Sequence, residues 1–242
     1  MNHIKYISLL LLTVILFSGC AMSPDDKKSS GSQLIVEFKV KGKIKINERD
    51  DRDLLRNYFI AINCDNSDGS YGPLPVVYKS SGSYGWGNGW GTSSKATQSK
   101  GITSFLKFNN ENPEGNVYLI VPKTQLRQYS SPFTPTYCSI TDDGKGIRAI
   151  FDYSLLETDD ISAENIKKLQ LNIITTNLII SNTTETTPGR RYDALGTEGN
   201  DYIDINAEKS YTFRGKDDEG DVADENLDIT SWSVQVVSKK TE

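Results

Sequence analysis

Apolar and charged side chains alternate along residues 34–46, and this pattern restricts the fold more than any other part of the chain. The apolar positions are Leu34, Val36, Phe38, Val40, Ile44 and Ile46, and those between them are mostly charged: Glu37, Lys39, Lys41, Lys43 and Lys45. A period of two residues predicts one or two half-buried β-strands, with Gly42 as a bulge or bend.

Further strand-like segments follow at short intervals. They cover residues 58–63, 74–78, 102–108, 117–121, 147–153, 169–176, 202–205 and 229–237. In the last segment Trp232, Val234 and Val236 share one face. Turn-forming clusters separate the segments, at residues 66–69, 109–115, 142–144, 188–189 and 217–221. Short strands punctuated in this way predict a mainly β protein, an antiparallel β-sandwich.

Helix is scarce in this pattern. The chain offers at most one short helix, over residues 162–168, with Ser162 or Asp160 as its cap. Neither an internal repeat nor a second linker interrupts the remainder, so we expect one β-sandwich domain from residue 33 to residue 242.

Composition excludes several classes of protein. The chain is 36% hydrophobic and 24% charged, which is typical of a globular protein. Lys and Arg total 27 against 32 Asp and Glu, a net charge of −5, and no long basic run is present. We therefore expect no nucleic-acid partner.

The N-terminus has the features of an export signal. Lys5 supplies positive charge, and the apolar run at residues 7–17 is too short to span a ~30 Å hydrocarbon core. The run ends in Leu16-Phe17-Ser18-Gly19-Cys20, which resembles the lipobox of bacterial lipoproteins, although Phe17 departs from the usual Leu. The alternative is an ordinary secretory signal with a chance cysteine.

The lipoprotein resemblance implies cleavage before Cys20 and acylation of its thiol. Residues 1–19 would be the signal peptide, and residues 20–32, small and polar, a flexible tether. Two or three acyl chains give stable membrane anchoring. The implied location is the bacterial cell envelope, outside the cytoplasm, and the outer membrane if the source has two membranes, because Ala21 rather than Asp follows the cysteine.

Three short segments of the folded part resemble DOMON-like sandwiches, which include the family 9 carbohydrate-binding modules. They are residues 58–66 (YFIAINCDN), 72–75 (GPLP) and 227–234 (LDITSWSV). The resemblance implies a sandwich and ligand binding, although a fold analogy does not establish function. Asn63 stands where that pattern more often has Asp, which weakens an inherited metal site.

A glycine-rich stretch at residues 80–92 holds Tyr84, Trp86, Asn88 and Trp90, with no strand pattern. Aromatic faces held at a surface stack on sugar rings, and Asn88 would bind hydroxyls, so this loop is a candidate glycan site. Alternatively, Trp86 and Trp90 fold inward and close one end of the sandwich, which is the reading we favour. A loop that contacts lipid or protein is a third alternative.

Acidic residues cluster in two places. Asp65 and Asp68, with Gly69, form half of a calcium-loop pattern, and residues 217–225 contain six carboxylates. Neither stretch has the full spacing of a calcium-binding loop, so solvated acidic turns are the favoured interpretation. We expect no cofactor, with Ca²⁺ as the alternative.

Histidine and cysteine limit the chemistry. The single histidine, His3, lies in the predicted signal peptide, so the mature chain has no Ser-His-Asp or Cys-His mechanism. Outside the cytoplasm Cys64 and Cys138 form either a disulfide or two thiols, with Cys64 as a small buried hydrophobe.

These observations predict a monomeric, lipid-anchored and non-enzymatic domain that binds a ligand, with a glycan as the candidate. The first alternative is a structural or assembly lipoprotein whose partner is another envelope protein. The second is a carboxylate-based hydrolase, although no spacing selects a catalytic pair.

Overall fold

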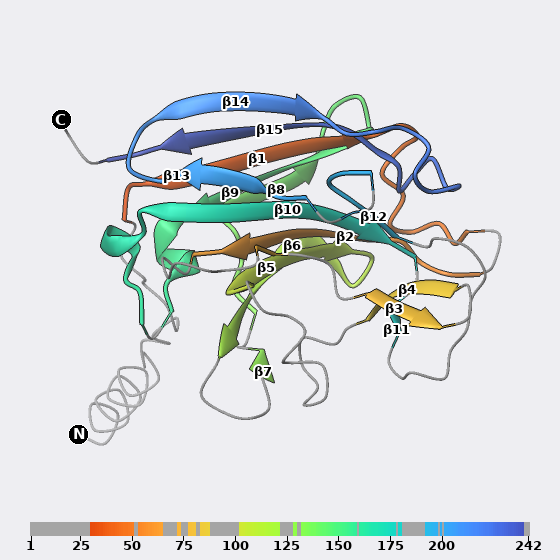
Figure 1. Ribbon diagram of the computed structural model, residues 1–242, viewed down its shortest axis with the longest axis horizontal. Helices are drawn as coiled ribbons and strands as arrows, with labels where there is room; N and C mark the ends of the chain where they lie inside the picture. The colour runs from red at the N-terminus through yellow and green to blue at the C-terminus, as the bar shows by residue number, and fades with distance from the viewer. Residues whose placement is uncertain are drawn as a thin grey trace, which may run out of the picture.

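Two antiparallel sheets pack face to face in the computed structural model, as predicted (Figure 1). The structure describes residues 30–50, 53–64, 72–73, 77–80, 83–87, 102–121, 128–129, 132–158, 160–177, 179–180, 192–197, 199 and 201–239. The described residues include no helix that is long and apolar enough to cross a membrane.

The first sheet has five strands, and each pairs antiparallel with its neighbours. In spatial order they are β14 (Tyr211–Lys216), β15 (Ile229–Val237), β1 (Gln33–Val40), β9 (Gly146–Asp152) and β8 (Tyr137–Ile140). The strand nearest the N-terminus therefore lies at the centre of the sheet, beside the strand nearest the C-terminus.

The second sheet covers the inner face of the first. Its order is β12 (Tyr192–Ala194), β10 (Lys168–Thr176), β2 (Asn57–Asn63), β5 (Ser104–Asn109), β6 (Asn112–Val121) and β7 (Gln128–Tyr129), and β13 (Ile203–Asn206) pairs with the other half of β10.

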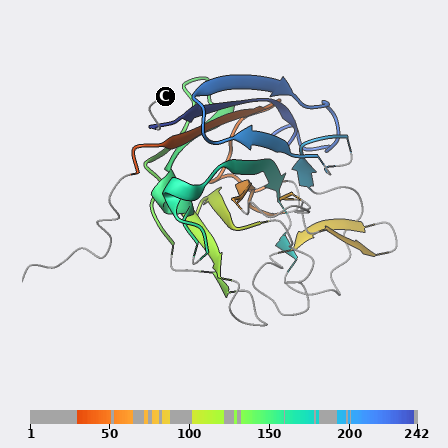
Figure 2. The ribbon, with the colours of Figure 1, turned by 60° about the vertical axis from the view of Figure 1, so that its left-hand side comes forward.

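A small third sheet stands apart from these two layers, as the turned view in Figure 2 shows for its yellow hairpin. It contains β3 (Val77–Ser80), β4 (Ser83–Gly87) and β11 (Ile179–Ile180). β4 pairs antiparallel with β3 and parallel with β11.

The core lies between the two large sheets. Leu34, Val36 and Phe38 on β1 are buried, whereas the residues between them are half exposed, as the alternation predicts. From the facing sheet, Ile60 and Ile173 pack into the same core. All seven residues of β2 are buried, because it is a central strand covered on both faces.

The second half of the alternating segment is not a strand. Pairing of β1 with β15 shifts in register between Lys39 and Val40, and the Gly42 backbone N–H donates to the Glu225 carbonyl at 2.7 Å. Ile44 and Ile46 still reach the core from this irregular backbone. Gly42 therefore marks a bend at which the strand ends.

The predicted helix is reduced to a single 3₁₀ turn, η3 (Ala163–Asn165). It does not extend further because Lys168 already belongs to β10 and pairs with Asn206 of β13. A second 3₁₀ turn, η2 (Tyr153–Leu156), was not predicted. Asp152 caps it by accepting a hydrogen bond from the Ser154 backbone N–H at 2.9 Å.

Both ends of the described chain lie at one end of the five-stranded sheet. Gln33 pairs with Val237, and the Lys239 backbone N–H donates to the Ser32 hydroxyl at 3.1 Å. The Ser30 backbone N–H and hydroxyl both donate to Asp152, at 3.0 and 2.8 Å. The segment that leads back toward Cys20 is thereby attached to the sheet at its Gln33 end.

Candidate functional site

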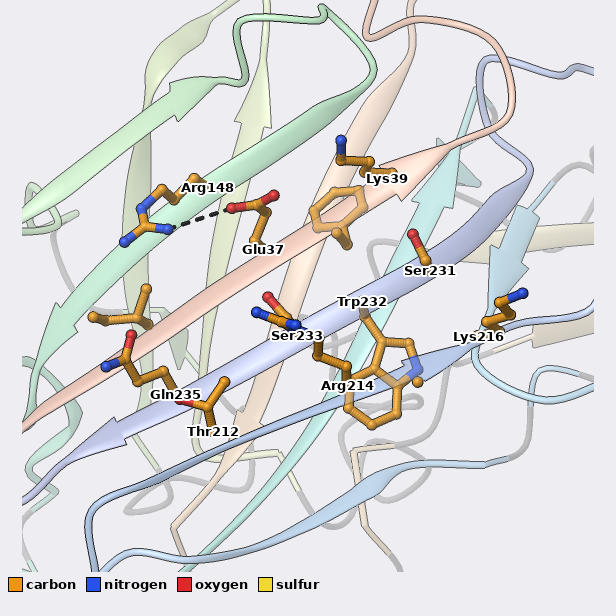
Figure 3. A pocket seen from close by; sticks show the side chains of 13 residues that line it. Glu37, Lys39, Arg148, Thr212, Arg214, Lys216, Ser231, Trp232, Ser233 and Gln235 are labelled. Atoms are coloured by element: carbon orange, nitrogen blue, oxygen red, sulfur yellow. Dashed lines mark hydrogen bonds and ion pairs between the residues drawn. The ribbon is translucent and has the colours of Figure 1, made fainter.

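A groove of about 630 Å³ crosses the outer face of the five-stranded sheet (Figure 3). Its side chains come from four adjacent strands, β14, β15, β1 and β9. The residues that line it through outward-facing side chains are Thr212, Arg214, Lys216, Ser231, Ser233, Gln235, Ile35, Glu37, Lys39 and Arg148.

The groove follows β15 because that strand carries small side chains between two strands with long ones. Ser231 and Ser233 form the floor. Arg214 of β14 pairs with Ser233 on one side, and Glu37 of β1 pairs with Ser233 on the other. Two short hydroxyl side chains flanked by long ones leave a hollow along the strand.

Strand register arranges these side chains in three rows across the sheet. The first row contains Lys216, Ser231 and Lys39, the second Arg214, Ser233, Glu37 and Arg148, and the third Thr212, Gln235 and Ile35. Neighbouring rows are roughly 7 Å apart along a strand. Charge is therefore confined to two rows, and the row nearest the Gln33 end of the sheet is uncharged.

Four cationic side chains and one carboxylate line the groove. Arg148 Nη1 lies 3.3 Å from Glu37 Oε2, and Lys39 Nζ lies 2.5 Å from Asp143 Oδ2. The hydrogen bond that the Lys39 ammonium donates to Asp143 raises the pKa of Lys39, and the same bond holds the pKa of Asp143 well below its usual range.

Arg214 and Lys216 differ from the other two cations. Both are exposed, and within the described part of the chain neither lies within ion-pair distance of a carboxylate. One wall of the groove therefore carries two positive charges that form no ion pair with a described carboxylate, although Lys216 also lines a second hollow that contains aspartates.

An aromatic row on the opposite face supports that wall. The Tyr211 and Phe213 rings stack at 5.3 Å, and the Trp232 ring meets Phe213 edge-on at 5.5 Å. Trp232 shares the inner face with Val234 and Val236, as predicted, and all three aromatic rings pack against the core. This packing holds the edge strand β14 in place.

A second hollow of about 350 Å³ lies beyond β14, and Trp232, Tyr202, Asp201 and Asp217 are among its lining residues. Asp217 accepts a hydrogen bond from the Gly196 backbone N–H at 2.9 Å, and burial raises its pKa to about 6. Asp218 accepts a hydrogen bond from the Thr197 hydroxyl.

The acidic segment 217–225 stabilises loops through hydrogen bonds and two ion pairs, Arg56–Asp224 and Lys41–Glu225. Asp224 accepts a hydrogen bond from Arg56 Nε at 2.8 Å and another from the Asn226 backbone N–H at 3.0 Å. Among the residues that the structure describes, no three His, Cys, Asp or Glu side chains are placed to hold a metal ion.

Most site residues predicted from the sequence lie outside the described part of the chain. This is true of Cys20, Asp65, Asp68, Asn88 and Trp90. Tyr84 and Trp86 belong to β4, so the start of the glycine-rich stretch is a strand, contrary to our expectation of a loop. Trp86 pairs with Val77 and with Ile179.

Cys64 and Cys138 are both thiols in the structure, which corresponds to the second of the two alternatives for this pair. Cys64 directly follows β2. Its backbone N–H donates at 3.0 Å to the hydroxyl of Thr103, the residue that precedes β5. Cys138 packs against Gly115, near the other end of β5. Burial raises the pKa of the Cys138 thiol to about 12, so it is protonated at neutral pH.

The groove was not predicted from the sequence, because β14 was not predicted as a strand. A signal was present: in residues 211–216 (YTFRGK) Tyr and Phe alternate with Thr, Arg and Lys. That alternation places Arg214 and Lys216 on the face opposite the aromatic rings. Compared with protein-family models, with curated proteins and with solved structures, the chain matches none.

Proposed function

We propose that this protein is a lipid-anchored, extracytoplasmic binding domain that holds a glycan in the groove along β15. One observation carries the proposal: a floor of serine hydroxyls runs along an interior strand, between walls of long polar side chains. This arrangement presents hydrogen-bonding side chains along a line, which suits an extended ligand.

The groove suits a glycan better than an extended peptide. The β15 backbone already pairs with β1 on one side and β14 on the other, so no peptide strand can add to it. Recognition depends on side chains instead. The hydroxyls of Ser231, Ser233 and Thr212 and the amide of Gln235 both donate and accept hydrogen bonds, as sugar hydroxyls do.

A binding role agrees with the small number of carboxylate side chains in the groove. Glu37 is the one carboxylate among the described lining residues, and it is engaged with Arg148. Glycosidases ordinarily use two carboxylates on either side of the scissile bond. The groove therefore favours a binding protein over a carboxylate-based hydrolase.

The proposed anchor fits the placement of the groove. Acylated Cys20 would connect through residues 21–29 to Ser30, which is held by Asp152 at the Gln33 end of the sheet. The uncharged row of the groove is nearest to that end, and the two charged rows extend away from it.

The proposal can be tested by placing a large side chain on the floor of the groove. The full lipidated protein in detergent is screened against neutral and acidic oligosaccharides, and the best ligand is measured by calorimetry with the Ser233→Tyr variant. We expect at least a tenfold loss of affinity and an unchanged melting temperature. Ser162→Tyr, an exposed position outside the groove, is the matched control and should bind normally. Unchanged binding by Ser233→Tyr would place the ligand elsewhere.

One observation favours the alternative of an assembly lipoprotein. The edge strand β8 exposes two large hydrophobic side chains, Tyr137 at 46% and Ile140 at 37%. Exposed apolar residues on a sheet edge suit a protein partner. Crosslinking in cells from a photoreactive residue at Ile140, compared with one at Ser162, would trap such a partner if it exists.

A further inference from the structure

We infer that the ligand of the groove is an acidic glycan, a chain whose sugar units carry carboxylates, and that Arg214 and Lys216 bind those carboxylates. The inference rests on the proposed function and specifies its ligand class. It follows from where the groove has positive charge and where that charge is already compensated.

Arg214 and Lys216 are two residues apart on one strand, so their side chains leave the same face roughly 7 Å apart. They border Ser233 and Ser231 of the floor, respectively. Across the floor from Lys216 stands Lys39, two strands away or roughly 10 Å. Cations therefore stand on both sides of one end of the groove.

The cations on the two sides are not equivalent. Arg148 is engaged by Glu37, and Lys39 by Asp143, whereas Arg214 and Lys216 have no carboxylate partner within the described residues. Glu37 also repels an anion that approaches the middle of the second row. An anionic ligand is therefore attracted to the β14 side, where the planar Arg214 fork matches a carboxylate.

The rest of the chain strengthens this assignment. The chain has a net charge of −5 and therefore repels polyanions in general. The positive charge of the groove is a local exception to this negative charge. Thr212, Gln235 and Ile35 in the uncharged row offer hydrogen bonds and apolar surface without charge. The groove thus combines sugar-type contacts at one end with carboxylate-type contacts at the other.

An anionic membrane surface fits less well than an acidic glycan. The described chain leads back toward Cys20 from the Gln33 end of β1, and Lys39 lies six residues further along that strand, roughly 20 Å away. The first charged row is therefore at the opposite end of the sheet and the second near its middle, so neither lies beside the Gln33 end.

The test compares oligogalacturonate with its fully methyl-esterified form, in which each carboxylate is replaced by an uncharged methyl ester. With the full lipidated protein in detergent, we expect the acid to bind at least about tenfold more tightly than the ester, since charge-assisted hydrogen bonds are about twice as strong as neutral ones. Raising salt from about 0.05 to about 0.5 M should remove most of that advantage.

Variants then assign the effect to residues. Arg214→Gln with Lys216→Gln should reduce binding of the acid to the level of the ester, without lowering the melting temperature, because both side chains are exposed. Lys167→Gln with Lys209→Gln removes the same charge from exposed positions outside the groove and should leave binding unchanged.

Each contrary outcome separates this inference from the proposed function. Equal binding of acid and ester, both lost in Ser233→Tyr, would overturn the acidic ligand and leave a neutral glycan site. Binding of dextran sulfate without oligogalacturonate, or of phosphatidylglycerol vesicles alone, would also overturn the inference. If no oligosaccharide binds at all, the proposed function fails, and the inference fails with it.

Discussion

The indole ring of Trp232 lies directly against the backbone of Gly215 on the neighbouring strand, inside the edge of the sandwich. A Cβ atom at Gly215 would overlap the ring, so the position requires glycine for close approach. On the other face of the same strand, Arg214 and Lys216 form one wall of the groove. The fit of one aromatic ring therefore determines where that wall stands.

Gly215→Ala should displace Trp232 and destabilise the domain. Overpacking of a well-filled site costs about 1–3 kcal/mol, and urea unfolding followed by tryptophan emission would measure it. Thr212→Ala, on the outer face of the same strand, should change the free energy of unfolding by less than about 0.5 kcal/mol. Equal stability of Gly215→Ala and wild type would mean that the ring is not confined there.

The ion pair between Arg56 and Asp224 should contribute to stability through its burial. Arg56 is 7% exposed, and it also donates from Nη1 to the Glu48 carbonyl at 3.1 Å. Arg56→Met leaves the Asp224 carboxylate without its partner and should cost about 3–5 kcal/mol, as in other broken buried pairs.

Neutralising Asp224 as well should recover part of the stability that Arg56→Met loses. We expect Arg56→Met combined with Asp224→Asn to unfold at a higher urea concentration than Arg56→Met alone. In the exposed pair Lys41–Glu225, Lys41→Met should cost about 0–1 kcal/mol. A double variant that is less stable than the single one would argue against a charge effect.

Stability should fall with rising pH because of Asp217. Burial raises its pKa from an ordinary 3.8 to about 6, so between these values the folded state holds a proton that the unfolded state has released. The stabilisation is present below pH 3.8 and is lost as pH rises through 6. Asp217→Asn removes this dependence.

The gain in stability of Asp217→Asn over wild type should therefore be larger at pH 7.5 than at pH 4. The pKa of Asp217 is raised by about two, and at about 1.4 kcal/mol per pKa unit this sets an upper limit on the difference between the two pH values. Because the side chain is partly exposed, we expect a difference of about 1 kcal/mol. Urea midpoints at the two pH values measure it. Parallel pH profiles for the two proteins would contradict the raised pKa.

The lipoprotein prediction depends on one atom, the Cys20 sulfur. Cys20→Ser should abolish incorporation of labelled fatty acid and either release the protein from the membrane fraction or leave an uncleaved precursor. Cys138→Ser, at a half-buried thiol, serves as the control and should be labelled like wild type. Unchanged membrane partitioning of Cys20→Ser would show that another segment anchors the chain.

The sequence alone determined the fold class and the strands with strong local patterns. In β1 the alternation of Leu34, Val36 and Phe38 with charged residues identified the buried face, and β15 was predicted with its observed limits. These predictions succeeded because burial of one face of a strand is encoded in residues two positions apart.

Weak patterns and short segments were missed. β8 (Tyr137–Ile140) and β14 (Tyr211–Lys216) lie at the two edges of the five-stranded sheet, where partial exposure permits polar residues and blurs the alternation. The helix predicted after Ser162 was overridden because Lys168 pairs with β13. Tertiary pairing outweighed local propensity at that point.

Only the tertiary structure decided where the groove lies. Its walls and floor come from β1, β9, β14 and β15, which are adjacent through strand register and not through sequence. A shift of one residue in the pairing of β14 with β15 would turn Arg214 and Lys216 inward. The packing of Trp232 against Gly215 favours the observed register, and such a contact depends on the shapes of two distant side chains, which no local pattern encodes.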